Sequence, residues 1–145
     1  MTEESDRPRI LKAIKKVLSD TYDHMQDAME ALDDIGRGSL GAGMSPLVGG
    51  YAMREPKEKF RSALISIDSA EKALAPLAKR LEDGRVNDSH FNDEKAISVL
   101  RDVIVADYDQ MVARLSRGEA RESSWYRLRE LSEKIKDVFE LVADH

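Results

Sequence analysis

Residues 36–50 read GRGSLGAGMSPLVGG and hold six of the eight glycines of this 145-residue chain. Glycine and proline often interrupt helices and strands, so this stretch favours a flexible connection over a helix. The sequence on either side is different, because apolar residues recur there at three- and four-residue steps, as in amphipathic helices. The contrast predicts an all-α protein in which a long glycine-rich connection, residues 36–55, separates the first two helices.

Four helices are predicted from the apolar spacing, over residues 7–35, 56–83, 92–117 and 120–143. Gly36 and Gly118 stand where the first and third helices would end, a position at which glycine is common. The links after the second and third helices are short, and short links place successive helices antiparallel. We therefore expect residues 1–145 to form a single domain, an up-down antiparallel four-helix bundle.

Composition argues against several kinds of partner and chemistry. The net charge is −5, which gives no reason to expect nucleic acid or an anionic membrane as a partner. The chain has no cysteine, which removes disulfides and thiolate metal sites and suits a reducing cytoplasm. No apolar run approaches the roughly 18 residues that a membrane span requires. The sequence thus predicts a cytoplasmic protein.

A group of polar residues falls inside or beside the apolar faces of the predicted helices, near the middle of each helix. In an antiparallel bundle these residues would share one layer, with a histidine about one turn away. The group comprises Thr21, Glu71, Asp107 and Ser132, together with His24. Two interpretations remain open. The layer could fix the register of the helices, because any other packing leaves it unpaired, or it could bind a ligand between the helices.

The polar layer also contains the only metal-site candidate in the sequence, a mononuclear site built from Glu71, Asp107 and His24. A di-iron centre is not expected, because such bundles use two Glu-x-x-His repeats and this chain has none. We find no thiol nucleophile, no serine–histidine–acid order and no phosphate loop. The sequence therefore predicts no cofactor and no catalytic residue, and it favours a non-enzymatic protein.

The glycine-rich connection carries more apolar residues than a simple solvated tether would. Connections of this length inside a compact domain are often lids or binding segments. The apolar residues of the connection could cover the open end of the bundle or contact a partner. Alternatively, the connection is a mobile crossover with a few residues resting on the bundle. The candidate contact residues are Arg37, Leu40, Met44, Leu47, Tyr51 and Met53.

The third predicted helix is apolar on nearly every side, since Val99 and Val105 lie off its main stripe. Such a helix is usually buried on more than one side. We therefore expect a homodimer formed through this helix or through the face of small residues on the second helix. The leading interpretation is a protein-interaction or regulatory module that binds itself and another protein. The alternative is a small-molecule- or metal-binding bundle, enzymatic or not, that uses the polar layer beneath the connection.

Overall fold

The computed structural model describes the backbone of residues 3–44 and 49–143 and the side chains of residues 6–34 and 60–143. Within these ranges the chain is mostly helical and has no β-strand beyond one isolated bridge, so the predicted all-α class is confirmed. None of the helices in these ranges combines the length and the apolar character that crossing a membrane would require.

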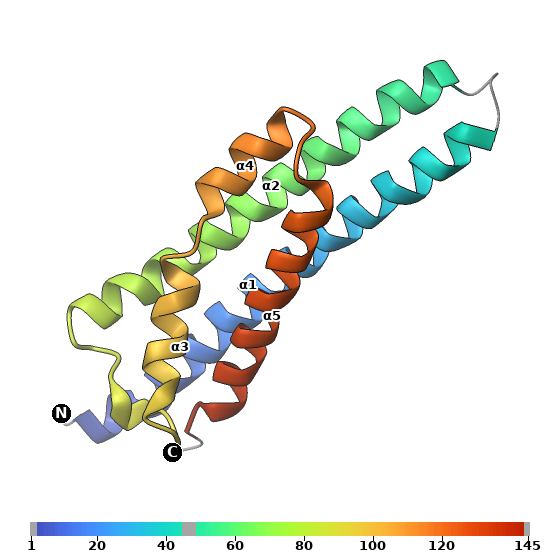
Figure 1. The fold of residues 1–145 in the computed structure, drawn as a ribbon. Helices are drawn as coiled ribbons and strands as arrows, with labels where there is room; N and C mark the ends of the chain where they lie inside the picture. Colours follow the sequence, from blue (N-terminus) through green and yellow to red (C-terminus); the bar gives the residue numbers. More distant parts are fainter. Residues whose placement is uncertain (1–2, 45–48, 144–145) are drawn as a thin grey trace.

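The helices run back and forth along one long axis (Figure 1). α1 leads away from the N-terminus, α2 returns, α3 and α4 follow each other outward again, and α5 leads back. A short 3-10 turn, η2, precedes α3. The elements are α1 (Glu3–Met44), α2 (Gly49–Glu82), η2 (Asp88–His90), α3 (Lys95–Ile104), α4 (Tyr108–Ser116) and α5 (Arg121–Leu141).

The long pair α1 and α2 forms the frame of the molecule and has the most extensive contact between any two elements. α5 packs mainly on α1 and also contacts α3, while α4 lies against α2 (Figure 1). The buried faces match the apolar stripes of the sequence, with Ile14, Leu18 and Met25 of α1 fully buried. On α5 the same holds for Leu128 and Leu131. The period of 3.6 residues per turn accounts for this agreement.

The single helix predicted over residues 92–117 is wrong, because the chain breaks between α3 and α4. Asp107 has φ −84° and ψ 49°, and the Tyr108 N–H donates to the carbonyl oxygen of Ala106 at 3.0 Å. This is close to the geometry of an inverse γ-turn. The buried Tyr108 hydroxyl donates to the Val103 oxygen at 2.6 Å, an acceptor that an unbroken helix would pair with the N–H of residue 107. The side chain of Tyr108 thus replaces a lost helical hydrogen bond.

An irregular connection over residues 36–55 is not confirmed either. α1 continues to Met44 and α2 already begins at Gly49, so only residues 45–48 lie outside the described backbone. The predicted boundaries at Ile35 and Pro56 made both helices too short. A glycine inside a helix costs about 1 kcal/mol relative to alanine but does not prevent helical geometry. The glycines of residues 36–44 are therefore compatible with a continued α1.

The end of the molecule where α1 begins and α5 ends is closed by backbone contacts (Figure 1). Phe91 and Val142 form the isolated bridge. The N–H of Asn92 donates to the carbonyl oxygen of Leu141 at 2.7 Å, and the N–H of Ala143 donates to the carbonyl oxygen of His90 at 2.9 Å. These bonds fix η2 and the two residues after it against the end of α5.

Candidate functional site

The two hydroxyls of the predicted polar layer are buried and satisfied by protein groups. Thr21 donates to the carbonyl oxygen of Val17 in its own helix at 2.7 Å. Ser132 donates to the Arg129 oxygen at 2.9 Å and accepts from the Gln26 side chain at 3.3 Å. The Gln26–Ser132 bond joins α1 to α5 and was not anticipated from the sequence. A hydrogen-bonded pair of this kind is the arrangement that fixes a register.

Glu71 lies half-buried on α2, where its charge is disfavoured. Burial raises the pKa of its carboxyl, and the negative charges of Asp109 and Asp68 raise it further, against the opposing effect of Lys72. Lys72 is held by Asp68 at 2.8 Å. Glu71 is thus a carboxylate whose charged form is destabilised, at the edge of the α2–α4 contact.

Asp107 does not point into the core, as a continuous helix would have required. The helix break leaves its side chain largely exposed, and it accepts from the Arg127 guanidinium of α5 at 3.0 Å. Burial raises the pKa of this carboxyl, but hydrogen bonds from Arg127 and the Asp107 backbone outweigh burial, with the charges of Arg127 and Arg114 adding to them. The net pKa lies below its ordinary value. Asp107 is therefore an ionised partner for an arginine.

The polar layer does not form a metal centre in the described part of the chain. That part contains no group of three or more histidine or carboxylate side chains placed to hold a metal ion. Glu71, Asp107 and His24 are consequently not assembled as ligands. His24 is half-buried on α1. A cavity of about 220 Å³ does lie beside Asp107 and Arg127, between α4 and α5, but the other layer residues do not line it.

The candidate contact residues of the predicted connection lie beyond the part of the molecule in which α1 and α2 contact α3, α4 or α5. Arg37, Leu40 and Met44 belong to α1, and Tyr51 and Met53 to α2, whereas Leu47 falls outside the described residues. Their side chains are outside the described set.

The helices that carry these residues extend past their neighbours. α5 begins beside Leu32, whose carbonyl oxygen accepts from Arg121 at 3.4 Å. From Leu32 to Met44, α1 continues for roughly 18 Å at 1.5 Å per residue. Along this length α1 and α2 run side by side without α4 or α5 (Figure 1). We call residues 35–44 of α1 and 49–59 of α2 the projecting arm.

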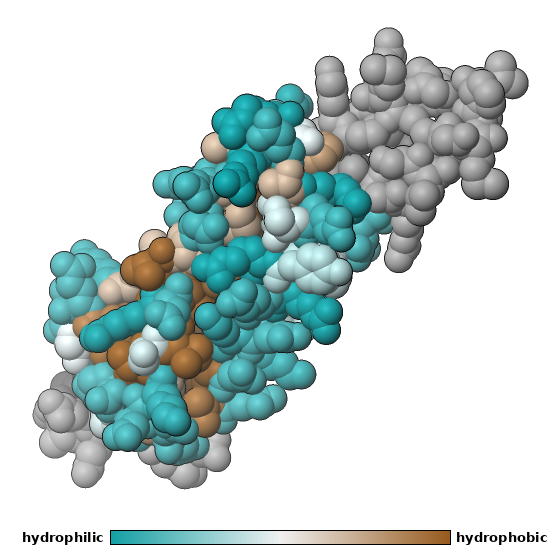
Figure 2. Space-filling model, in the orientation of Figure 1, coloured by the Kyte–Doolittle hydropathy of each residue, from teal (hydrophilic) through white to brown (hydrophobic). Residues whose placement is uncertain are grey.

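The face proposed for dimerisation is partly exposed. Val105, in the break after α3, is 78% exposed, whereas Val99 is half-buried. Ile104 and Val105 line a groove of about 170 Å³ with Ala78 and Leu81 of α2. Figure 2 shows apolar surface over the region of α3, surrounded by hydrophilic residues.

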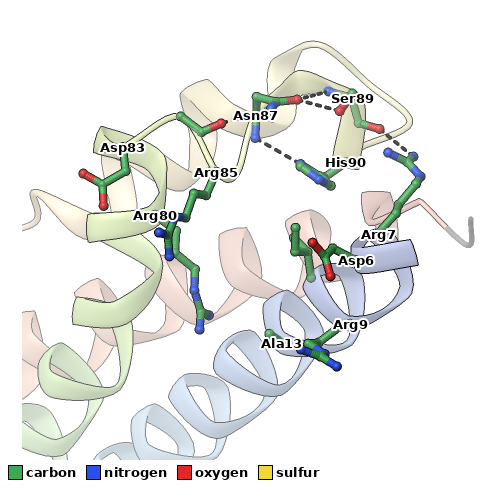
Figure 3. Close-up of a pocket in the computed structure, with 12 residues that line it drawn as sticks. Asp6, Arg7, Arg9, Ala13, Arg80, Asp83, Arg85, Asn87, Ser89 and His90 are labelled. Carbon is green, nitrogen blue, oxygen red and sulfur yellow. Dashed lines mark hydrogen bonds between the residues drawn. The ribbon is translucent and has the colours of Figure 1, made fainter. Parts of the chain in front are cut away.

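A larger feature was missed by sequence reasoning, at the end of the molecule opposite the projecting arm. The start of α1, the end of α2 and the link over residues 83–90 enclose an open cavity of about 830 Å³ (Figure 3). Its charged lining residues are Asp6, Arg7, Arg9, Arg80, Asp83 and Arg85. The signal was present in the sequence, because antiparallel packing brings the basic start of the first helix to the basic end of the second.

Local structure explains the shape of this cavity. α2 ends at a turn in which Gly84 has φ 77°, a left-handed conformation that favours glycine. The buried Val86 follows, and its N–H donates to the Arg80 oxygen at 3.1 Å. Because Val86 anchors the link to the core, the adjacent Arg85 stays exposed at the cavity.

Comparisons with protein-family models, with curated proteins and with solved structures each found no match to this chain.

Proposed function

We propose that the chain is a non-enzymatic protein-interaction module, an up-down four-helix bundle that associates through its projecting arm. The observation that carries this proposal is the extension of α1 and α2 beyond the start of α5 at Leu32. The simplest partner is a second copy of the chain, with another protein as a further partner.

The arm is an incomplete structure by itself. Before the arm, α1 and α2 each run beside further helices, whereas in the arm they run beside each other alone (Figure 1). The arm nevertheless contains the large apolar residues Leu40, Met44, Tyr51 and Met53. Two arms placed side by side would restore a four-helix cross-section. Apolar burial supplies about 25 cal/mol per Å², so even a short arm contributes usefully to association.

The polar layer fits a structural role within this proposal. Thr21 and Ser132 have protein partners, and Asp107 is neutralised by Arg127. Such pairing favours one register of the helices over the alternatives. The alternative function is metal or small-molecule binding at the layer. Stoichiometric metal in the purified protein that is lost in Asp107→Ala, with folding retained, would support that alternative.

A photo-crosslinking experiment tests the proposal. A photoreactive phenylalanine analogue replaces Leu40 or Tyr51, and a matched control replaces Asp137, an exposed residue of α5. Irradiation of cells that make the protein should give a discrete adduct from the arm positions, at twice the mass of the chain. An adduct of another mass would identify a different protein partner. Crosslinking from the arm that does not exceed that from position 137 would refute the arm as an interaction site.

A further inference from the structure

The arginine-lined cavity has more positive than negative side chains in its lining. Four arginines face two aspartates in its lining: Arg7, Arg9, Arg80 and Arg85 against Asp6 and Asp83. The chain as a whole has a net charge of −5, so this concentration of cations opposes the overall balance. Cavities lined by one sign of charge focus the electrostatic field and attract ligands of the other sign.

The charges in the cavity are also unpaired. Among the described residues, the guanidinium groups of Arg9, Arg80 and Arg85 form neither an ion pair nor a hydrogen bond, and neither lining aspartate pairs with them. Arg7 donates to the carbonyl oxygen of Ser89 at 2.7 Å, which orients the guanidinium without cancelling its charge. Guanidinium groups left in this state keep most of their donors available, and these match the oxygens of phosphate in two-point hydrogen bonding.

One wall of the cavity is held together by hydrogen bonds within the link. Asn87 accepts from the Ser89 N–H at 3.0 Å and from the Ser89 hydroxyl at 2.6 Å. The Asn87 N–H in turn donates to Nδ1 of His90 at 3.1 Å (Figure 3). His90 is buried, and its carbonyl oxygen accepts from Ala143. This network holds Ser89, and through it Arg7, in place before any ligand arrives, and preorganised groups bind more tightly.

We propose that this cavity binds a small phosphate-bearing molecule, with Arg7, Arg9, Arg80 and Arg85 contacting its phosphate oxygens. The cavity volume lies within the range of small-molecule sites, about 300–1,000 Å³, and exceeds what a single inorganic phosphate would fill. The site draws residues from the start of α1, the end of α2 and the link over residues 83–90. A ligand here would bridge the N-terminal region to the rest of the bundle. The projecting arm is at the opposite end, so this inference does not depend on the proposed function.

Isothermal titration calorimetry with inorganic pyrophosphate tests the site, in buffer of constant ionic strength. The variants are Arg80→Ala and Arg85→Ala, and the control is Arg101→Ala, which removes an equal charge from an exposed position on α3 outside the cavity. Saturable binding to the wild type is expected. Each cavity variant should lose about tenfold in affinity, as expected for the loss of hydrogen bonds to a charged group, and the control should bind as the wild type.

Circular dichroism of each variant confirms that a loss of affinity is not a loss of fold. Nuclear magnetic resonance locates the site, since the backbone signals of Gly84, Ser89 and His90 should move with pyrophosphate. No binding at millimolar pyrophosphate, or equal weakening in all three variants, would overturn the inference. The second result would show attraction by general charge only.

Discussion

The Tyr108 hydroxyl and the Val103 carbonyl oxygen lie 2.6 Å apart and join α4 to α3 across the break in the helix. Burial raises the pKa of Tyr108, and the charge of Glu71 raises it further, so the hydroxyl stays protonated and continues to donate. Both groups are in the core, because Tyr108 and Val103 are almost fully buried.

Removing this hydroxyl should destabilise the fold. Tyr108→Phe keeps the ring but leaves the Val103 oxygen with only the weak bond from Ala106 at 3.4 Å, so we expect a loss of about 1 kcal/mol in the free energy of unfolding. Tyr126→Phe is the control, because Tyr126 is 57% exposed, and it should change stability by less than about 0.5 kcal/mol. Urea denaturation measures both. Equal effects would mean that the buried bond adds nothing.

Asp107 and Arg127 should make stability depend on pH in the acid range. Because the folded pKa of Asp107 is below its unfolded value, the contribution is fully present above about pH 4 and is lost as pH falls through the folded pKa. Asp107→Asn should therefore cost stability at neutral pH, by less than about 1 kcal/mol because the pair is partly exposed. The cost should shrink in acid. A difference that stays constant between neutral pH and strong acid would contradict the role of the ion pair.

Glu71 should show the opposite dependence. Its folded pKa is raised, so its contribution to stability is fully present below the unfolded pKa and is lost as pH rises through the folded pKa. Glu71→Gln should raise the free energy of unfolding at pH 7, by less than about 1 kcal/mol, and the gain should vanish below about pH 4. Thermal unfolding across this pH range gives the comparison. A variant that is less stable at pH 7 would show that the carboxylate has a stabilising partner.

Ala120, just before α5, has φ 60°, which is left-handed for a residue with a Cβ atom. This conformation costs roughly 1–2 kcal/mol for a residue with a Cβ atom. Glycine removes that cost, but it also increases the conformational entropy of the unfolded chain, which offsets part of the gain in stability. Ala120→Gly should therefore stabilise the protein by about 0.5 kcal/mol. Ala113→Gly, at an exposed helical position in α4, should instead destabilise it by about 1 kcal/mol. Chemical denaturation of the two variants should give opposite signs.

The apolar faces were predictable because the helical period alone decides them. Ile14 and Leu18 on α1 and Ile135 on α5 lie in the core as their spacing predicts. The helix break could not be predicted in the same way, since residues 96–106 contain no glycine or proline. It depends on the tertiary position of Tyr108, which satisfies the Val103 oxygen from outside the helix.

The missed break also explains the misplacement of Asp107. A helical wheel through residues 92–117 assumes one axis, and the turn at residues 105–107 changes the direction of every later side chain. The arginine-lined cavity was missed for a related reason. Its residues are unremarkable within each helix, and only the meeting of Arg7 and Arg9 with Arg80 and Arg85 at one end of the molecule makes them a site.

Association through the projecting arm is tested most directly by the molar mass in solution. Size-exclusion chromatography with light scattering should give twice the chain mass for the wild type at high concentration. The double variant Leu40→Ser with Tyr51→Ser should give the mass of one chain, with unchanged unfolding of the rest of the molecule. A wild type that remains monomeric at the highest attainable concentration, or a double variant that still dimerises, would contradict this account.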